Sequence, residues 1–396
     1  MAERAEGRSK MRREVAIAAL ALMLVFVFVA ITTQSAQAQT FTSIYRFTGS
    51  SGDEPFAGLV QDAEGNLYGT TELGGGANLG VVFKIDTSGA ETVLHDFEGG
   101  ADGQYPYAAL VLDKSGNLYG TTSEGGSSNQ GTVFRVDRAG NEAVLHSFAG
   151  GTSDGCNPYG GLIEDKAGNL YGTTPECGAS SEGTVFKVTK KGKETVLHSF
   201  AGGSSDGGYP FYGNLLMDKK GNLYGVTEVG GSSSEGVLYK LSKSGRVTVL
   251  YSFTGGTSDG CYPFGTPARD KKGDFYGTTE TCGSTTAGTV WKVSKKGTDT
   301  ILHNFADAAS DGAYPFAGVV VDAKGNLFGV TQAGGASGAG VVYEVSKSGT
   351  FTLVHSFSFS DGSQPFAGLL QDATGALYGT TIVGGTDSAG TVWSLK

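Results

Sequence analysis

The sequence predicts an all-β fold, a seven-bladed β-propeller with four antiparallel strands per blade. Three observations predict it. A Gly-rich pattern recurs seven times at steps of 50 to 53 residues. Six periods hold four short segments rich in apolar and aromatic residues. The seventh holds three, and a segment that matches the missing one precedes the first period. Repeats of this length are typical of propellers and related arrays.

The composition agrees with a closed, well-packed fold. Among 396 residues there are 66 Gly and only 9 Pro, and 39% of the residues are hydrophobic. Collagen would need Gly at every third position with abundant Pro, and disordered chains carry fewer apolar residues. The sequence therefore has enough apolar side chains for a large core.

Each period contains recognisable strand and turn signals. In the first period the four strands are expected over residues 56–61, 66–71, 81–85 and 92–97. An Asp-x-x-Gly turn joins the first two, and a similar Asp-to-Gly turn joins the last two, as in tight hairpins. The first turn begins at Asp62, Asp113, Asp165, Asp218, Asp270, Asp322 and Asp372. In the fourth period one extra residue near 212–215 predicts a β-bulge.

Ring closure follows from the two ends of the repeat region. The seventh period stops after its third strand, residues 391–395, whereas residues 41–47 match the fourth strand of the other periods. Pairing these two segments would complete the last blade and remove open sheet edges. We therefore expect one propeller domain over residues 39–396, and we expect a monomer.

Residues 1–38 read as a secretory signal. Five basic residues precede an apolar run over 15–31, and Ala36-Gln37-Ala38 matches an A-x-A cleavage site. The alternative is an uncleaved membrane anchor. Removal of 1–38 leaves 24 basic and 36 acidic side chains (29 minus five and 39 minus three), a formal net charge of −12. We expect an exported protein (secreted, periplasmic or on the cell surface) with no membrane span after cleavage, and the acidic charge argues against nucleic-acid binding.

The repeat resembles a known family. The run Gly-Asn-Leu-Tyr-Gly-Thr-Thr, a Gly-Gly loop, Gly-Thr-Val-Phe-Lys-Val and Val-Leu-His-Ser-Phe recur through residues 41–396. Together they are similar to the Gloeo/Verruco (GloVer) tandem repeat of exported bacterial proteins. This resemblance implies an exported repeat protein and no established activity.

The four cysteines predict two disulfides within blades. Cys156 and Cys177 are 21 residues apart, as are Cys261 and Cys282, and each pair is symmetric about its first hairpin turn. Antiparallel pairing would place the partners opposite one another, and export favours oxidation. The alternative, a zinc site, lacks the usual close Cys spacing.

All five histidines occupy one repeat position on the strand expected to be outermost. We interpret them as packing residues, because a catalytic His is normally singular and lies near other polar groups. They are His95, His146, His198, His303 and His355.

The two faces of the ring should differ. Lysines gather at the hairpin turns, whereas the opposite loops carry acidic residues, so the acidic loop face around the channel is the predicted binding surface. The candidate binding residues there are Asp102, Asp154, Asp206, Asp259, Asp311, Asp361, Tyr105, Tyr209, Tyr262 and Tyr314. Glu72, Glu124, Glu176, Glu228 and Glu280 lie on the same face. The alternative is that each Asp only caps its own turn.

Acidic and aromatic side chains together suit a carbohydrate, or a cell-surface or protein ligand. Calcium is the one candidate cofactor, because it prefers oxygen ligands; no other metal site is expected. Glu164 and Arg269 depart from the repeat on the inner strands and are further candidate binding residues. We expect a non-catalytic binding protein, since a glycosidase needs two carboxyl groups at a set separation. The alternative is a carbohydrate-active glycosidase or lyase with its site at the channel mouth.

Overall fold

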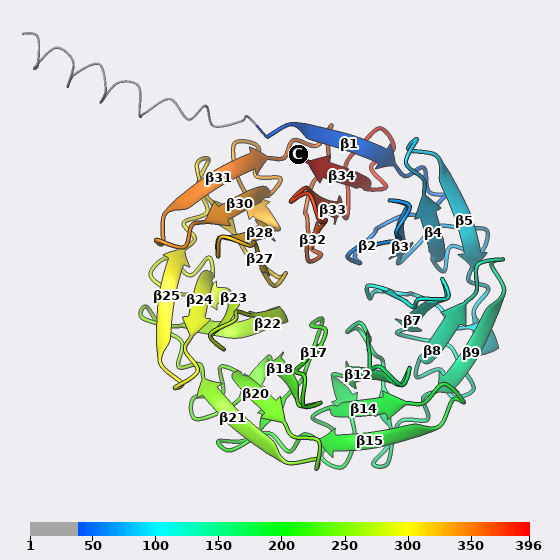
Figure 1. Ribbon diagram of the computed structural model, residues 1–396, viewed down its shortest axis with the longest axis horizontal. Helices are drawn as coiled ribbons and strands as arrows, with labels where there is room; N and C mark the ends of the chain where they lie inside the picture. The colour runs from blue at the N-terminus through cyan, green and yellow to red at the C-terminus, as the bar shows by residue number, and fades with distance from the viewer. Residues whose placement is uncertain (1–38) are drawn as a thin grey trace, which may run out of the picture. The chain divides into compact units, whose positions relative to one another are not determined.

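The computed structural model describes residues 39–396, which form seven four-stranded antiparallel sheets arranged in a ring (Figure 1). The predicted signal over residues 1–38 lies outside the described residues. In six blades the chain runs from the innermost strand to the outermost one, and in the seventh blade the N-terminal β1 supplies the outermost strand. The innermost strands are β2 (Val60–Gln61), β6 (Val111–Leu112), β11 (Ile163–Glu164), β17 (Leu216–Met217), β22 (Gly260–Arg269), β27 (Val320–Val321) and β32 (Leu370–Gln371).

The second strands are β3 (Leu67–Thr71), β7 (Leu118–Thr122), β12 (Leu170–Thr174), β18 (Leu223–Thr227), β23 (Phe275–Cys282), β28 (Leu327–Thr331) and β33 (Leu377–Thr381). The third are β4 (Val81–Ile85), β8 (Thr132–Val136), β14 (Thr184–Val188), β20 (Val237–Leu241), β24 (Thr289–Val293), β30 (Val341–Val345) and β34 (Thr391–Leu395). The outermost are β5 (Glu91–Asp96), β9 (Glu142–Ser147), β15 (Glu194–Ser199), β21 (Val247–Ser252), β25 (Asp299–Asn304), β31 (Phe351–Ser356) and β1 (Phe41–Arg46).

The predicted ring closure is confirmed. β1, from the N-terminal side of the repeats, pairs antiparallel with β34, and Phe41 lies opposite Leu395 (Figure 1). The amide of Phe47 then donates to the carbonyl oxygen of Gly390 at 3.0 Å. The seventh sheet thus has the order β1-β34-β33-β32, and it joins the two ends of the ring.

The innermost strands are shorter than predicted. In the first blade only Val60 and Gln61 pair with β3, although residues 56–61 were expected to be strand. The preceding segment leaves the sheet, and its aromatic residue, Phe56, lines the channel. The predicted bulge in the fourth blade is also wrong. β17 pairs regularly with β18, and the extra residue is absorbed earlier, in a tight turn where the Gly213 amide donates to the Phe211 carbonyl.

Neighbouring blades are held together by a repeated glycine and aromatic contact. In the third blade Gly172 on β12 lies against Phe186 on β14, and a Cβ at Gly172 would lie 2.6 Å from the Phe186 ring. The Phe186 side chain is fully buried, and its ring lies edge-on to Phe148 of the preceding blade, with centroids 5.1 Å apart. The same contacts recur in all seven blades, so the glycine of each second strand makes room for the core aromatic of the third strand.

Both predicted disulfides are present. Cys156–Cys177 and Cys261–Cys282 join Cα atoms 5.6 and 5.5 Å apart. The first links β10 (Gly155–Cys156) to β13 (Glu176–Cys177), a small two-stranded sheet on the loop face. Similar pairs without cysteine are β16 (Gly207–Gly208) with β19 (Val229–Gly230), and β26 (Gly312–Ala313) with β29 (Ala333–Gly334). A single 3₁₀ turn, η1, covers Gly100–Asp102 in the described chain.

Within residues 39–396, no helix has the length and hydrophobicity needed to cross a membrane.

Candidate functional site

A closed ring of aromatic side chains surrounds the axis on the loop face. Each blade contributes the residue that follows its repeated proline. The centroids of neighbouring rings lie 4.8 to 6.5 Å apart all the way round, including the contact at 5.4 Å that joins the first blade to the seventh. We call this set the aromatic ring: Phe56, Tyr107, Tyr159, Phe211, Phe264, Phe316 and Phe366.

Tyr212 lies inside the aromatic ring, near the axis. Its ring centroid is 5.0 Å from Phe366, 5.7 Å from Tyr159 and 6.4 Å from Tyr107, residues of three other blades. A side chain can contact blades on opposite sides only if it reaches the centre. The extra residue of the fourth blade, in which Asp218 follows Pro210 by eight positions instead of seven, produces this placement.

Below the aromatic ring the channel forms a cavity of about 620 Å³. Its walls are the inner segments of the blades, with apolar residues such as Leu59, Leu110 and Val319, and its far end is lined by Arg269 and Gln371. A cavity of this size falls within the range of small-molecule sites, which are mostly apolar with a few polar groups.

Glu72 is the most perturbed carboxyl group of this region. The Tyr107 hydroxyl donates to its Oε1 atom, and the side chain of Glu54 lies within hydrogen-bonding reach. Burial raises the pKa of Glu72 to about 7; the Tyr107 hydrogen bond opposes this rise, and the nearby charge of Glu54 adds to it. Glu72 can therefore hold or release a proton near neutral pH.

Two further glutamates lie on the opposite side of the axis. Burial raises the pKa of Glu228, and burial together with the charge of Glu228 raises that of Glu280. The charges of Glu72 and Glu228 both act on Tyr212, whose pKa is raised mainly by burial. The mouth of the channel thus combines aromatic faces, phenol hydroxyls and carboxyl groups.

The four predicted tyrosines stand two positions before members of the aromatic ring in the sequence. Tyr105, Tyr209, Tyr262 and Tyr314 each precede a proline and have positive φ angles of 60°, 53°, 56° and 57°. The same conformation occurs at Glu54, Asn157 and Gln364 in the other three blades. The Tyr105 amide donates to the carbonyl of Leu79 in the preceding blade at 2.9 Å, so the strained turn is held by a contact between blades. These four tyrosines are partly exposed, Tyr314 at 37%.

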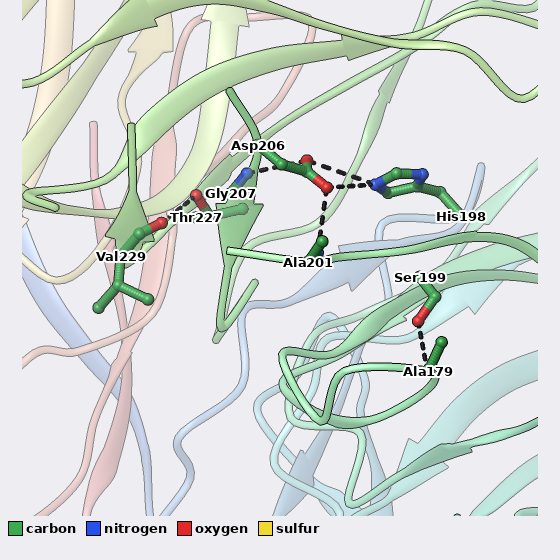
Figure 2. Close-up of polar contacts among 8 residues, drawn as sticks. All are labelled: Ala179, His198, Ser199, Ala201, Asp206, Gly207, Thr227 and Val229. Atoms are coloured by element: carbon green, nitrogen blue, oxygen red, sulfur yellow. Dashed lines mark hydrogen bonds and ion pairs between the residues drawn. The ribbon is translucent and has the colours of Figure 1, made fainter. Parts of the chain in front are cut away.

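The six predicted aspartates lie instead at the outer wall. Figure 2 shows the pattern for Asp206, whose carboxylate accepts from the amides of Ala201 and Gly207 and contacts the His198 ring at 3.1 Å. Each of the other five likewise accepts backbone amide bonds in its loop or pairs with a His or Tyr of the outermost strand. Those pairs are His95–Asp102, His146–Asp154, Tyr251–Asp259, His303–Asp311 and His355–Asp361. Turn capping accounts for their repetition, and their binding role stays a prediction.

The histidines pack as expected and also pair with these aspartates. His198, for example, lies edge-on to Phe200, with ring centroids 4.8 Å apart.

Glu164 and Arg269 occupy the same strand position two blades apart. The Arg269 guanidinium lies over the rings of Tyr224 and Phe275, 4.9 and 5.0 Å from their centroids, and lines the cavity. Burial raises the pKa of Tyr119 in the preceding blade, and the charge of Glu164 adds to this rise. Burial also raises the pKa of the Glu164 carboxyl group. Among the described residues Glu164 is not part of the cavity lining, so these two side chains do not form one site.

The aromatic ring was missed at the sequence level, although its signal was present. An aromatic residue follows the repeated proline in all seven periods, and the one extra residue falls directly after it in the fourth. The role of Glu72 had no such signal, because acidic residues are common on the whole loop face.

Comparison with protein families gives a match to the Gloeobacter/Verrucomicrobia repeat over residues 28–215 and 211–396. The chain belongs to the Gloeobacter/Verrucomicrobia repeat family. The predicted resemblance is therefore confirmed, and the seven propeller blades are the structure of this family's repeat in the present chain. Comparison with curated proteins gives no significant match.

Solved structures share the fold of this Gloeobacter/Verrucomicrobia repeat protein. The structure titled "Streptogramin B lyase structure" matches with a TM-score of 0.61 and 12% identity, covering 90% of this chain and 97% of that one. The extracellular domain of the putative one-component system BT4673 from B. thetaiotaomicron matches with a TM-score of 0.57 and 12% identity. That match covers 90% of this chain and 40% of the other. At such identities the likeness concerns the fold alone.

Proposed function

We propose that this chain is an exported, non-catalytic propeller that binds saccharides at the aromatic mouth of its channel. The observation that carries the proposal is the closed aromatic ring around Tyr212, flanked by Glu72 on one side and by Glu228 on the other. Aromatic faces pack against the apolar faces of sugar rings, and carboxylates accept hydrogen bonds from sugar hydroxyls. The two disulfides support export, since such bonds persist in oxidising compartments.

Binding is proposed to require no cofactor, and the protein is proposed to act as a monomer. The test is a glycan array followed by calorimetric titration of each retained glycan, with calcium and then with a chelator. Light scattering on the same sample gives the assembly state. A glycan that binds only in the presence of calcium would show that the site needs a bound calcium ion.

Two variants test where the glycan binds. Tyr212→Ala removes the central aromatic face and should weaken binding at least tenfold, and Tyr107→Phe removes the hydroxyl that donates to Glu72 and should weaken it severalfold. Tyr251→Phe is the matched control, because it removes a hydroxyl that pairs with Asp259 on the outer wall. Unchanged binding by folded Tyr212→Ala and Tyr107→Phe would contradict the proposed site, and silence across the array would contradict saccharide binding.

The Glu72 carboxyl beside the Tyr107 hydroxyl favours a second candidate, a glycosidase or lyase acting at the same mouth. A Glu72 carboxyl that titrates near neutral pH, in contact with the Tyr107 hydroxyl, has the properties of a general acid or base. Release of reducing ends or unsaturated products from polysaccharides between pH 5 and 8, lost in Glu72→Gln, would support catalysis. A polysaccharide that binds without being cleaved by the wild type would favour the binding protein.

A further inference from the structure

Three potential metal ligands meet at the outer wall between the second and third blades. They are His146 on β9, Asp154 in the following loop and Glu194 at the start of β15. One donor atom from each lies within 4.8 Å of the other two. Among residues 39–396 this is the one group of three His, Cys, Asp or Glu side chains with that geometry. It lies two residues from Cys156, beside the disulfide of the third blade.

One of the three donors has unused capacity. Glu194 Oε1 is buried from solvent and makes no hydrogen bond within the described structure, whereas His146 Nε2 faces Asp154 Oδ2 at 3.3 Å. Asp154 accepts from the amides of Ala149 and Gly155 at 2.8 and 2.7 Å, which holds its carboxylate toward the histidine. Buried polar atoms normally have partners, and a cation held by the three side chains would be a partner for Glu194 Oε1.

Two of the three donor atoms have the spacing of ligands on a small transition-metal ion, and the third lies within 4.8 Å of both. Zinc binds His nitrogen and carboxylate oxygen at about 2.0 to 2.2 Å in a tetrahedron, which places two ligand atoms roughly 3.4 Å apart. His146 Nε2 and Asp154 Oδ2 are 3.3 Å apart. Three protein ligands leave the fourth position of a zinc tetrahedron for a further ligand such as water.

The charge also calls for a cation. Two carboxylates and a neutral imidazole carry a formal charge of −2, which a divalent ion balances.

We propose that His146, Asp154 and Glu194 bind one Zn²⁺ ion, which joins the outer strands of the second and third blades. Calcium does not fit this donor set, because it prefers six to eight oxygen ligands, whereas imidazole with carboxylates suits zinc and related metals.

The repeat supplies internal controls. At the next blade interface His198 and Asp206 form the same pair (Figure 2). Val247, which begins β21, occupies the repeat position of the third ligand there. One interface earlier, His95, Asp102 and Glu142 have the same residue types. They do not form a group with the spacing found around His146 in the described chain.

The experiment uses untagged full-length protein stripped with a chelator. It is titrated with ZnCl₂ and separately with CaCl₂ by calorimetry, and bound metal is counted by mass spectrometry after dialysis. The wild type should retain one Zn²⁺ per chain and show a higher thermal midpoint with zinc. Glu194→Gln should bind at least tenfold more weakly, whereas Glu142→Gln, the matched change at the earlier interface, should bind as the wild type does.

His146→Gln and its control His198→Gln repeat the comparison at a second ligand, in case Glu194→Gln fails to fold by circular dichroism. Loss of zinc in His146→Gln with retention in His198→Gln supports the site. Equal zinc uptake by all variants, no zinc uptake by the wild type, or preferential calcium uptake would overturn it.

Discussion

Replacement of Glu142 by Gln should stabilise the propeller at pH 8 more than at pH 5. Glu142 begins β9 on the outer wall, and its Oε1 atom is buried without a hydrogen-bond partner. Burial raises the pKa of this carboxyl from 4.5 to about 7; the charge of Asp102 adds to the rise, while His95 and Arg135 oppose it. The folded protein therefore binds the proton more tightly than the unfolded chain does.

The sign and size of the effect follow from this difference. The stability contributed by protonation is fully present below pH 4.5 and is lost as the pH rises through about 7. A difference of 2.5 pKa units (7 minus 4.5) corresponds to about 3.4 kcal/mol in full. Because the carboxyl is only half-buried, solvent screening reduces this to about 1 to 1.5 kcal/mol. Glutamine stays neutral, so the variant avoids this loss.

The assay is urea unfolding of wild type and Glu142→Gln at pH 5 and pH 8, followed by the fluorescence of the buried Trp291 and Trp393. The advantage of the variant should grow by about 1 kcal/mol between the two pH values. Glu64→Gln, at an exposed turn, is the control and should show no such change. A difference for Glu142→Gln that is equal at both pH values, or larger at pH 5, would refute the reasoning.

Two further changes test the packing between strands and the loop face. Gly172→Ala places a methyl group 2.6 Å from the buried Phe186 ring and should cost about 1 to 3 kcal/mol of unfolding free energy. Gly368→Ala, which enters open space, should be nearly neutral by the same urea assay; equal effects would argue against the steric account. Replacing Cys156 and Cys177 together by Ser opens a link of 21 residues and should cost about 3 kcal/mol, read as a lower urea midpoint. An unchanged midpoint would show that this disulfide does not contribute to stability.

Much of the fold could be predicted because its determinants are local and repeated. The Asp-x-x-Gly turns, the alternating segments and the Cys spacing each concern residues a few positions apart or opposite one another in a hairpin. Even closure by β1 followed from counting strands. The lengths of the inner strands did not follow, since pairing depends on the neighbouring strand. It begins only at Val60 in the first blade, whereas β22 pairs from Gly260 onward in the fifth.

The candidate site divides in the same way. The sequence by itself determined seven blades, two disulfides and the loop face as the place where acidic and aromatic residues gather. Only the tertiary structure decided which of them meet. It placed the repeated aspartates at the outer wall beside the histidines, and it brought Tyr212 and the proline-following aromatics of all seven blades to one point. The physical reason is that convergence on an axis depends on the summed rotation of every blade, so residues more than 300 positions apart, such as Phe56 and Phe366, become neighbours.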